Sequence, residues 1–144
     1  PAYKGIPLAT ATGIALQPDY NRDLSVTFDR KEVKSHGAGG ILMGAPLSGN
    51  VLIVDDVITA GTAIRHSVYL IRSEGATPHG VVIGLDRCER GAVDTSALEE
   101  VRRMLGLQVQ SVITMHDIIE WLSEQPDMSK SLDLMHQYRE QYGV

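Results

Sequence analysis

The sequence predicts a single α/β domain, residues 1–144, in which a mostly parallel central sheet is flanked by helices on both faces. Short runs of β-branched and other apolar residues, such as 51–54 and 81–85, alternate with stretches of helical periodicity. This alternation favours parallel strands, and right-handed crossovers would place helices on both faces of the sheet. The chain has 144 residues and is 43% hydrophobic, which suits one compact core.

The composition narrows the functional class. A formal net charge of −5 gives no argument for binding to nucleic acid or to a membrane surface. Cys88 is the single cysteine, so no intrachain disulfide can form and a reducing compartment is favoured. No apolar run approaches the roughly 18 residues of a membrane span. We therefore expect a cytoplasmic protein that binds neither nucleic acid nor membrane.

The N-terminal third of the chain predicts one helix and two strands. Pro7 suits the first turn of a helix that continues through the small residues 8–16 and ends in a polar turn at 17–22. Residues 24–28 alternate in part between apolar and polar side chains, which is typical of a strand. Residues 41–47 predict a short returning strand.

The centre of the chain predicts a strand, a helix and a second strand. Residues 51–54 form a continuous apolar run, which is typical of a buried strand. Residues 63–73 share one apolar helical face, and Gly75 suits the position just beyond the end of that helix. Residues 81–85 form a second continuous apolar run and predict another strand.

The C-terminal part predicts a strand between helices. Ser96 and Glu99 match a capping box that opens a helix to residue 105, and residues 109–113 follow as a strand. Thr114 is a second possible cap, before a helix that ends at residue 123. A terminal helix is expected over residues 128–142, and its buried side would carry Met128, Leu132, Leu134, Met135 and Tyr138.

Two adjacent carboxylates, Asp55 and Asp56, follow the central strand. A charged turn is one interpretation, since strand ends often carry aspartate. However, adjacent carboxylates repel each other, so keeping both favours a cationic or hydroxyl-rich partner. Ligands of open α/β sheets bind at the carboxyl ends of the strands. We therefore interpret the pair as part of a site for a phosphorylated sugar.

The small and hydroxylated loop Thr59-Ala60-Gly61-Thr62 comes next. Thr62 could simply cap the following helix. Alternatively, the backbone N–H groups and the two hydroxyls would cradle a phosphate. The loop is not a P-loop, because Gly61 stands where that motif requires a lysine directly before the Ser/Thr. A nucleotide triphosphatase is therefore disfavoured.

The run 54–63, Val-Asp-Asp-Val-Ile-Thr-Ala-Gly-Thr-Ala, closely resembles the 5-phosphoribosyl-1-pyrophosphate (PRPP) signature of the type I phosphoribosyltransferases. Residues 1–8, 30–37 and 86–91 are similar to segments of the orotate phosphoribosyltransferases, and the resemblance spans the whole chain. It implies a type I phosphoribosyltransferase fold. It also implies transfer of 5-phosphoribosyl from PRPP to orotate, which gives orotidine 5′-monophosphate and pyrophosphate in pyrimidine (UMP) synthesis.

The resemblance implies roles for individual residues. Asp55 and Asp56 would bind the ribose hydroxyls and stabilise positive charge that develops on the ribose. The implied PRPP-binding set comprises Tyr3, Lys4, Arg30, Lys31, Lys34, His36, Asp55, Asp56, Val57, Ile58, Thr59, Ala60, Gly61, Thr62 and Ala63. Mg²⁺ would arrive on PRPP, with no direct protein ligand.

The basic segment at residues 30–40 carries Arg30, Lys31, Lys34 and His36, followed by glycines. Its composition alone favours a solvated, mobile surface loop. Beside a pyrophosphate leaving group, its cations would neutralise developing charge, and its glycines would let it close over the substrate. Lys34 is accordingly expected to be catalytic.

In the resembling family this segment is a mobile lid that also serves the neighbouring subunit, which implies a homodimer with shared active sites. Ser35 and Ala38 stand where other members often carry acids. In that family an N-terminal hood completes the orotate pocket. Because the chain begins at Pro1, inside a loop with functional features, we expect that segment to precede it.

Arg87, after the second apolar strand, has two interpretations. It could form a surface ion pair with Asp86 or Glu89, which would contribute little. Alternatively, its guanidinium would meet the orotate carboxylate, with Thr59 also near orotate, as the resemblance implies. A purine phosphoribosyltransferase is a second enzyme hypothesis, but it has no use for a carboxylate-binding arginine. A PRPP-sensing regulator could dispense with the basic lid and would need a positive patch for nucleic acid.

Overall fold

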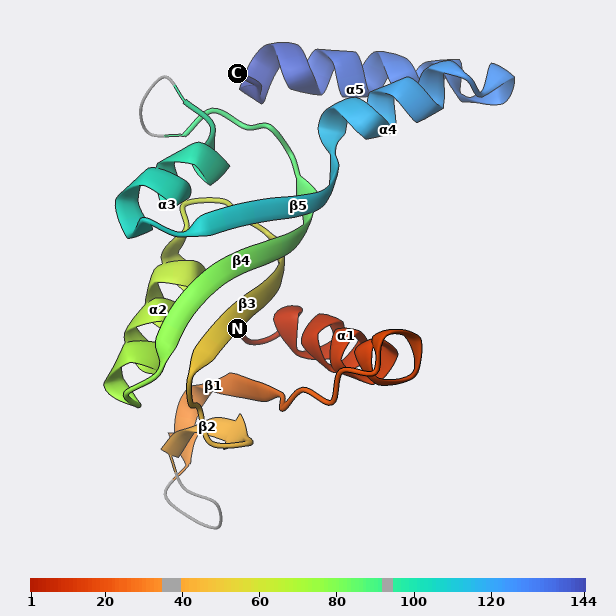
Figure 1. Ribbon diagram of the computed structural model, residues 1–144. Coiled ribbons are helices and arrows are strands. Elements are labelled where there is room, and N and C mark those ends of the chain that lie inside the picture. Colours follow the sequence, from red (N-terminus) through yellow and green to blue (C-terminus); the bar gives the residue numbers. More distant parts are fainter. Residues whose placement is uncertain (35–39, 92–94) are drawn as a thin grey trace. The chain divides into compact units, whose positions relative to one another are not determined.

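The computed structural model describes residues 1–34, 40–91 and 95–144, apart from the side chains of residues 33 and 34. The chain forms two compact units. The first contains Pro1–Asp56 and Ala63–Val81, and the second contains Val57–Thr62 and Val82–Val144. Figure 1 labels the helices and strands of both units.

The first unit contains the N-terminal helix α1 (Gly5–Tyr20), the strands β1 (Thr27–Lys34) and β2 (Gly40–Gly44), most of β3 (Asn50–Val57) and nearly all of α2 (Thr62–Ser73). β1 and β2 are antiparallel, and they appear as the orange hairpin in Figure 1. The core of this unit is aliphatic, with α2 supplying one apolar face. Its buried side chains are Ile53, Ile64, Val68, Leu70, Ile71, Ala76 and Val81.

The second unit contains the end of β4 (Thr77–Asp86), α3 (Ala97–Leu105), β5 (Gln108–Thr114), α4 (Met115–Ser123), a 3₁₀ turn (Pro126–Met128) and α5 (Ser129–Tyr142). α4 lies alongside α5, and α3 packs on β5 (Figure 1). The core comes from both apolar strands and from the inward faces of α3 and α4. Its buried side chains are Ile58, Ile83, Ala97, Leu98, Val101, Leu107, Val109, Met115, Ile119 and Leu122.

A three-stranded parallel sheet runs in the order β3–β4–β5. The predicted mixed α/β class is therefore confirmed. β4 is the central strand, and its Val81 and Ile83 are each 1% exposed. The prediction that residues 51–54 form a fully buried strand is wrong at Leu52, which is 53% exposed. The reason is that β3 is an edge strand of this sheet, so its faces are only partly covered.

Most predicted helix ends are confirmed. The Ser96 hydroxyl accepts a hydrogen bond from the Glu99 backbone at 3.1 Å, and Gly106 ends α3 in the left-handed region at φ 64°. Thr114 and Asp117 form a complete capping box at the start of α4. These side chains satisfy backbone N–H groups that the first turn of a helix leaves without partners. Side-chain hydrogen bonds from Ser96 and Thr114 therefore determine where α3 and α4 begin.

Three predictions of local structure need correction. Residues 17–20 continue α1 rather than forming a turn. The helix includes Pro18 and ends where Asn21 turns left-handed at φ 51°. Residues 29–34 belong to β1 instead of a loop, because β2 pairs with this segment. α5 has no buried residue, and Leu134 is 57% exposed, so the predicted buried side is only half-covered.

None of the helices in the described ranges is long and apolar enough to cross a membrane.

Candidate active site

The predicted acid pair lies near the end of β3. Asp55 is 7% exposed, whereas the side chain of Asp56 is 27% exposed, as expected for successive residues on opposite faces of a strand. The Asp56 backbone N–H donates a hydrogen bond to Asp55 Oδ1 at 2.9 Å. Burial raises the pKa of Asp55, and the adjacent Asp56 charge acts in the same direction. The site therefore holds a desolvated carboxylate that a hydroxyl donor or a positive charge would stabilise.

The start of the chain supplies a cation to this pair. Lys4 Nζ lies 2.7 Å from Asp56 Oδ2, although the Lys4 side chain is 78% exposed. Gly5 permits this approach, because a Cβ at that position would lie 2.8 Å from the Val54 carbonyl oxygen. Tyr3 is joined to the basic segment, since Lys31 Nζ lies 4.8 Å from the centre of its ring. Four of the predicted PRPP-binding residues thus meet in two pairs, Lys4 with Asp56 and Tyr3 with Lys31.

Asp29 holds this arrangement in place, although no sequence pattern had indicated a role for it. Its Oδ1 accepts a hydrogen bond from the Ala2 backbone N–H at 2.5 Å, and its Oδ2 lies 3.8 Å from His66 Nε2. The side chain is 12% exposed. Asp29 therefore holds the backbone next to Tyr3 against β1. No local pattern could have revealed it, because the contact with Ala2 spans 27 residues of sequence.

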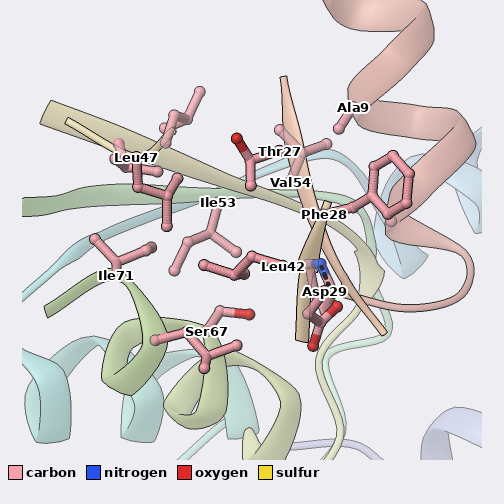
Figure 2. Close-up of a pocket in the computed structure, with 15 residues that line it drawn as sticks. Ala9, Thr27, Phe28, Asp29, Leu42, Leu47, Ile53, Val54, Ser67 and Ile71 are labelled. Atoms are coloured by element: carbon pink, nitrogen blue, oxygen red, sulfur yellow. Dashed lines mark ion pairs between the residues drawn. The ribbon is translucent and has the colours of Figure 1, made fainter. Parts of the chain in front are cut away.

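A cavity in the same unit is not suited to PRPP. Figure 2 shows it beside β3, with side chains from β1, β2 and α2 pointing into it. Its wall is mostly apolar and includes Phe28, Leu42, Ile53 and Ile71. A strongly anionic sugar phosphate would lose its hydration there without gaining charged partners. The polar end of β3 therefore remains the candidate site in this unit.

The basic segment is only partly described. Arg30 is half-buried and Lys31 exposed, and both lie on β1. β1 advances five residues from Asp29 to Lys34 while β2 advances two from Leu42 to Gly40, so the pairing is irregular here. The side chain of Lys34 and all of His36 lie outside the described residues.

The predicted phosphate loop belongs to the second unit. Ile58 is buried at 6% exposure and fixes the start of the loop, while Thr59, Ala60 and Thr62 are exposed. Gly61 adopts φ 67°, a conformation that glycine reaches without steric cost. The loop leads into the first turn of α2 at Thr62. Exposed hydroxyls before a helix N-terminus are an arrangement that binds anions.

Arg87 lies just beyond β4, at a tight turn. The Cys88 backbone N–H donates to Asp86 Oδ1 at 2.9 Å, and Cys88 is left-handed at φ 50°. Arg87 Nη2 lies 2.9 Å from Glu89 Oε2, so the ion pair considered from the sequence is present. The Arg87 Nε is buried and has no hydrogen-bond partner within the described part of the chain.

Sequence reasoning missed a partner of this arginine loop on the last helix. The Tyr138 hydroxyl donates a hydrogen bond to Glu89 Oε1. This bond raises the pKa of Tyr138 above that of an ordinary phenol. The apolar spacing of α5 had indicated only packing for this residue.

Among the residues that the structure describes, no three His, Cys, Asp or Glu side chains gather in a group that could hold a metal ion. Asp55 and Asp56 are two neighbouring carboxylates, a donor set that suits the hydroxyls and the hydrated metal of a sugar phosphate better than a closed metal cage.

Comparison with known proteins places this geometry in a family. No family model matches the chain. It is 54% identical over all 144 residues to the orotate phosphoribosyltransferases of Yersinia enterocolitica and Cronobacter sakazakii, and it covers 68% of the length of each. The crystal structure of the Francisella tularensis orotate phosphoribosyltransferase superposes with a TM-score of 0.79 at 37% identity. That match covers 100% of this chain and 68% of the crystallised one.

The Mycobacterium tuberculosis orotate phosphoribosyltransferase in complex with PRPP is 25% identical, with a TM-score of 0.62 over 81% of this chain and 60% of that chain. The expected type I phosphoribosyltransferase fold is therefore confirmed. With 54% identity over its whole length to curated members, the chain belongs to the orotate phosphoribosyltransferase family.

Proposed function

We propose that this chain transfers the 5-phosphoribosyl group from PRPP to orotate, giving orotidine 5′-monophosphate and pyrophosphate in pyrimidine biosynthesis. The observation that carries this function is the 54% identity over all 144 residues to curated orotate phosphoribosyltransferases. The residue roles that follow are argued from the contacts of each unit. We also propose that residues 1–144 act together as one catalytic core.

The acid pair is proposed to hold the ribose. The side chain of Asp56 is 27% exposed, so the 2′- and 3′-hydroxyls can reach its carboxylate beside Lys4. Asp55 is buried, and burial strengthens its interaction with any positive charge that develops nearby. As the bond from C1 to pyrophosphate lengthens, the ribose becomes positively charged, and two fixed carboxylates would stabilise that state more than the ground state.

The pyrophosphate is proposed to bind among Tyr3, Lys4, Arg30, Lys31, Lys34 and His36. Lys4 and Lys31 are exposed cations, and Tyr3 links its segment to Lys31. Mg²⁺ bound to PRPP would neutralise part of the charge on the leaving pyrophosphate. We propose Lys34 as the group that acts mainly on departure of the leaving group, within a lid about residues 30–40 whose first part is the end of β1.

The 5′-phosphate is proposed to bind at residues 57–63, where Thr59 and Thr62 are exposed and Gly61 is left-handed. Orotate is proposed to bind through Arg87, with Thr59 nearby. Orotate carries a carboxylate, and a guanidinium recognises that planar anion through paired hydrogen bonds. The Arg87 Nε has no partner among the residues that the structure describes, and this supports the role, because a buried donor without an acceptor costs stability unless a ligand supplies one.

We further propose a homodimer that shares lid residues between subunits, a cytoplasmic location, and no binding to nucleic acid or membranes. The proposal of a homodimer is based on the resemblance of the basic segment to the lid of the family. Location in the cytoplasm is favoured by the single cysteine.

The function is tested by measuring pyrophosphate release from PRPP by the full-length protein, with orotate, adenine or hypoxanthine as acceptor. Release that depends on orotate is expected. Activity with a purine and none with orotate would instead support a purine phosphoribosyltransferase. Tight PRPP binding without any release would indicate a PRPP sensor.

The role of Lys34 has its own test. Lys34→Ala is expected to lower kcat strongly while changing the affinity for PRPP little, because the charge is needed most as pyrophosphate leaves. Lys130→Ala, on the exposed surface of α5, is the matched control. An unchanged kcat in Lys34→Ala would refute a catalytic role for the lid.

A further inference from the structure

One nitrogen of the Arg87 guanidinium is bound to Glu89, and a second one has no protein acceptor among the described residues. Its Nη2 is bound to Glu89 at 2.9 Å, while its Nε is buried without a hydrogen-bond partner among the described residues. The side chain as a whole is 30% exposed. Glu89 therefore limits where the guanidinium can point, and part of its donor set remains for a ligand.

Glu89 is itself fixed by a second residue. Its Oε2 faces Arg87, and its Oε1 accepts the hydrogen bond from Tyr138. Its backbone carbonyl accepts a hydrogen bond from the Ala97 N–H at 3.1 Å, at the start of α3. Each carboxylate oxygen thus has a different partner, and rotation of the Glu89 side chain would break one of the two contacts.

The end of the chain is fastened to the same loop. The Arg90 backbone N–H donates to the Tyr142 carbonyl at 2.8 Å, and the Val144 N–H donates to the Cys88 carbonyl at 3.2 Å. The Arg90 side chain also donates to the Gly143 carbonyl at 3.2 Å. The tail after α5 therefore lies as an added backbone segment along residues 88–90, and it keeps Tyr138 within reach of Glu89.

We propose that Glu89 and Tyr138 are positioning residues that orient the Arg87 guanidinium toward the carboxylate of the pyrimidine ligand, so that the C-terminal helix sets substrate specificity. This inference rests on the proposed carboxylate-binding role of Arg87. A purely structural role for Tyr138, in which its hydroxyl only fastens α5, is the alternative.

The two roles differ in which ligands they affect. Orotidine 5′-monophosphate and uridine 5′-monophosphate share the ribose phosphate and differ by the carboxylate on the base. A positioning role predicts weaker binding of the carboxylated nucleotide alone. A structural role predicts a lower Tm with an unchanged affinity ratio between the two nucleotides.

The test compares Tyr138→Phe with Tyr142→Phe in the full-length protein, by titration of each nucleotide and by thermal unfolding. Tyr142 is a matched control, because its ring lies 4.9 Å from that of Tyr138 on the same helix. We expect Tyr138→Phe to lower the affinity for orotidine 5′-monophosphate about five- to tenfold, because a hydrogen bond to a charged group is lost. The affinity for uridine 5′-monophosphate should stay unchanged. Tyr142→Phe should change neither affinity.

Two further variants make the outcome decisive. Glu89→Gln keeps the side-chain shape but removes its charge. It should reduce the ratio of the affinity for orotidine 5′-monophosphate to that for uridine 5′-monophosphate at least as much as Tyr138→Phe does. Arg87→Ala should abolish the preference for the carboxylated nucleotide. If Arg87→Ala leaves that preference intact, the proposed function of Arg87 fails. If Arg87→Ala abolishes it while Tyr138→Phe and Glu89→Gln leave it intact, the positioning role alone is overturned.

Discussion

The variant Gly5→Ala tests whether the close approach of Gly5 to β3 brings Lys4 into contact with Asp56. Gly5 is buried at the first residue of α1, directly against the end of β3. A Cβ added there would lie 2.8 Å from the Val54 carbonyl oxygen, 3.0 Å from Pro1 Cδ and 3.4 Å from Asp55 Oδ1. The nearest of these atoms is backbone within a strand, so it cannot move aside without disturbing β3.

The expected cost follows from two opposing effects. Overpacking a well-filled position costs about 1–3 kcal/mol. Alanine regains up to about 1 kcal/mol of helix propensity relative to glycine, and less at the first residue of a helix. We therefore expect a net loss of about 1–2 kcal/mol in the free energy of unfolding, and a fall in Tm of about 3–8 °C for a chain of this size.

The same displacement should be visible in catalysis. Moving the start of α1 away from β3 separates Lys4 from Asp56, which now lie 2.7 Å apart. On the proposed assignment both residues bind PRPP, so the KM for PRPP should rise at least about threefold, because small misplacements of binding groups are costly. The KM for orotate should change less.

Gly13→Ala is the control on the same helix, where the gain in helix propensity is at least as large as at Gly5. Its Cβ would meet a methyl group of Val26 at 2.8 Å, a side-chain contact outside the strands and not a contact with strand backbone. The assays are thermal unfolding by circular dichroism and steady-state kinetics with PRPP varied. Equal Tm and equal KM for the two variants would refute the argument that close approach at Gly5 shapes the site.

Three further predictions concern titration and capping. Burial raises the pKa of Asp55, so its contribution to stability is present below the unfolded pKa, about 3.9, and is lost as pH rises through the folded value. Asp55→Asn should therefore have a higher Tm than the wild type at pH 7 and lose that advantage near pH 4, while activity disappears; a Tm at pH 7 below that of the wild type would contradict this. Burial also raises the pKa of the Cys88 thiol, so iodoacetamide should alkylate the folded chain with a midpoint above about 8.5, the ordinary value, and unfolding in urea should restore that value. Thr114→Ala removes the capping box of α4 and should lower the free energy of unfolding by about 1 kcal/mol, whereas Thr10→Ala, on the exposed face of α1, should lower it very little; equal losses in denaturant unfolding would argue against the cap.

The fold was predictable where the signal is local. Ser96 and Thr114 cap helices through side chains that bind a backbone N–H three residues on, and such contacts can be read from short sequence patterns. The exposure of Leu52 could not be read in the same way. It depends on β3 being an edge strand of its sheet, and strand order is not a local property.

The same distinction applies to the site. Asp55 and Asp56 stand in one continuous motif, and their placement at the end of β3 follows from strand periodicity. Asp29 and Tyr138 have no motif. They matter because they contact Ala2 and Glu89, over separations of 27 and 49 residues, and single-sequence reasoning has no means of finding contacts at that distance.

The contact between Lys4 and Asp56 explains how a site with opposed charges can be stable and still receive its substrate. An exposed ion pair contributes only about 0–1 kcal/mol, so breaking it costs little. On the proposed assignment, PRPP would replace this contact with a new partner for each charge, its pyrophosphate for Lys4 and its ribose diol for Asp56. Because the pair is exposed and contributes little, the exchange costs little, and the same two side chains can hold the empty site together and bind the substrate.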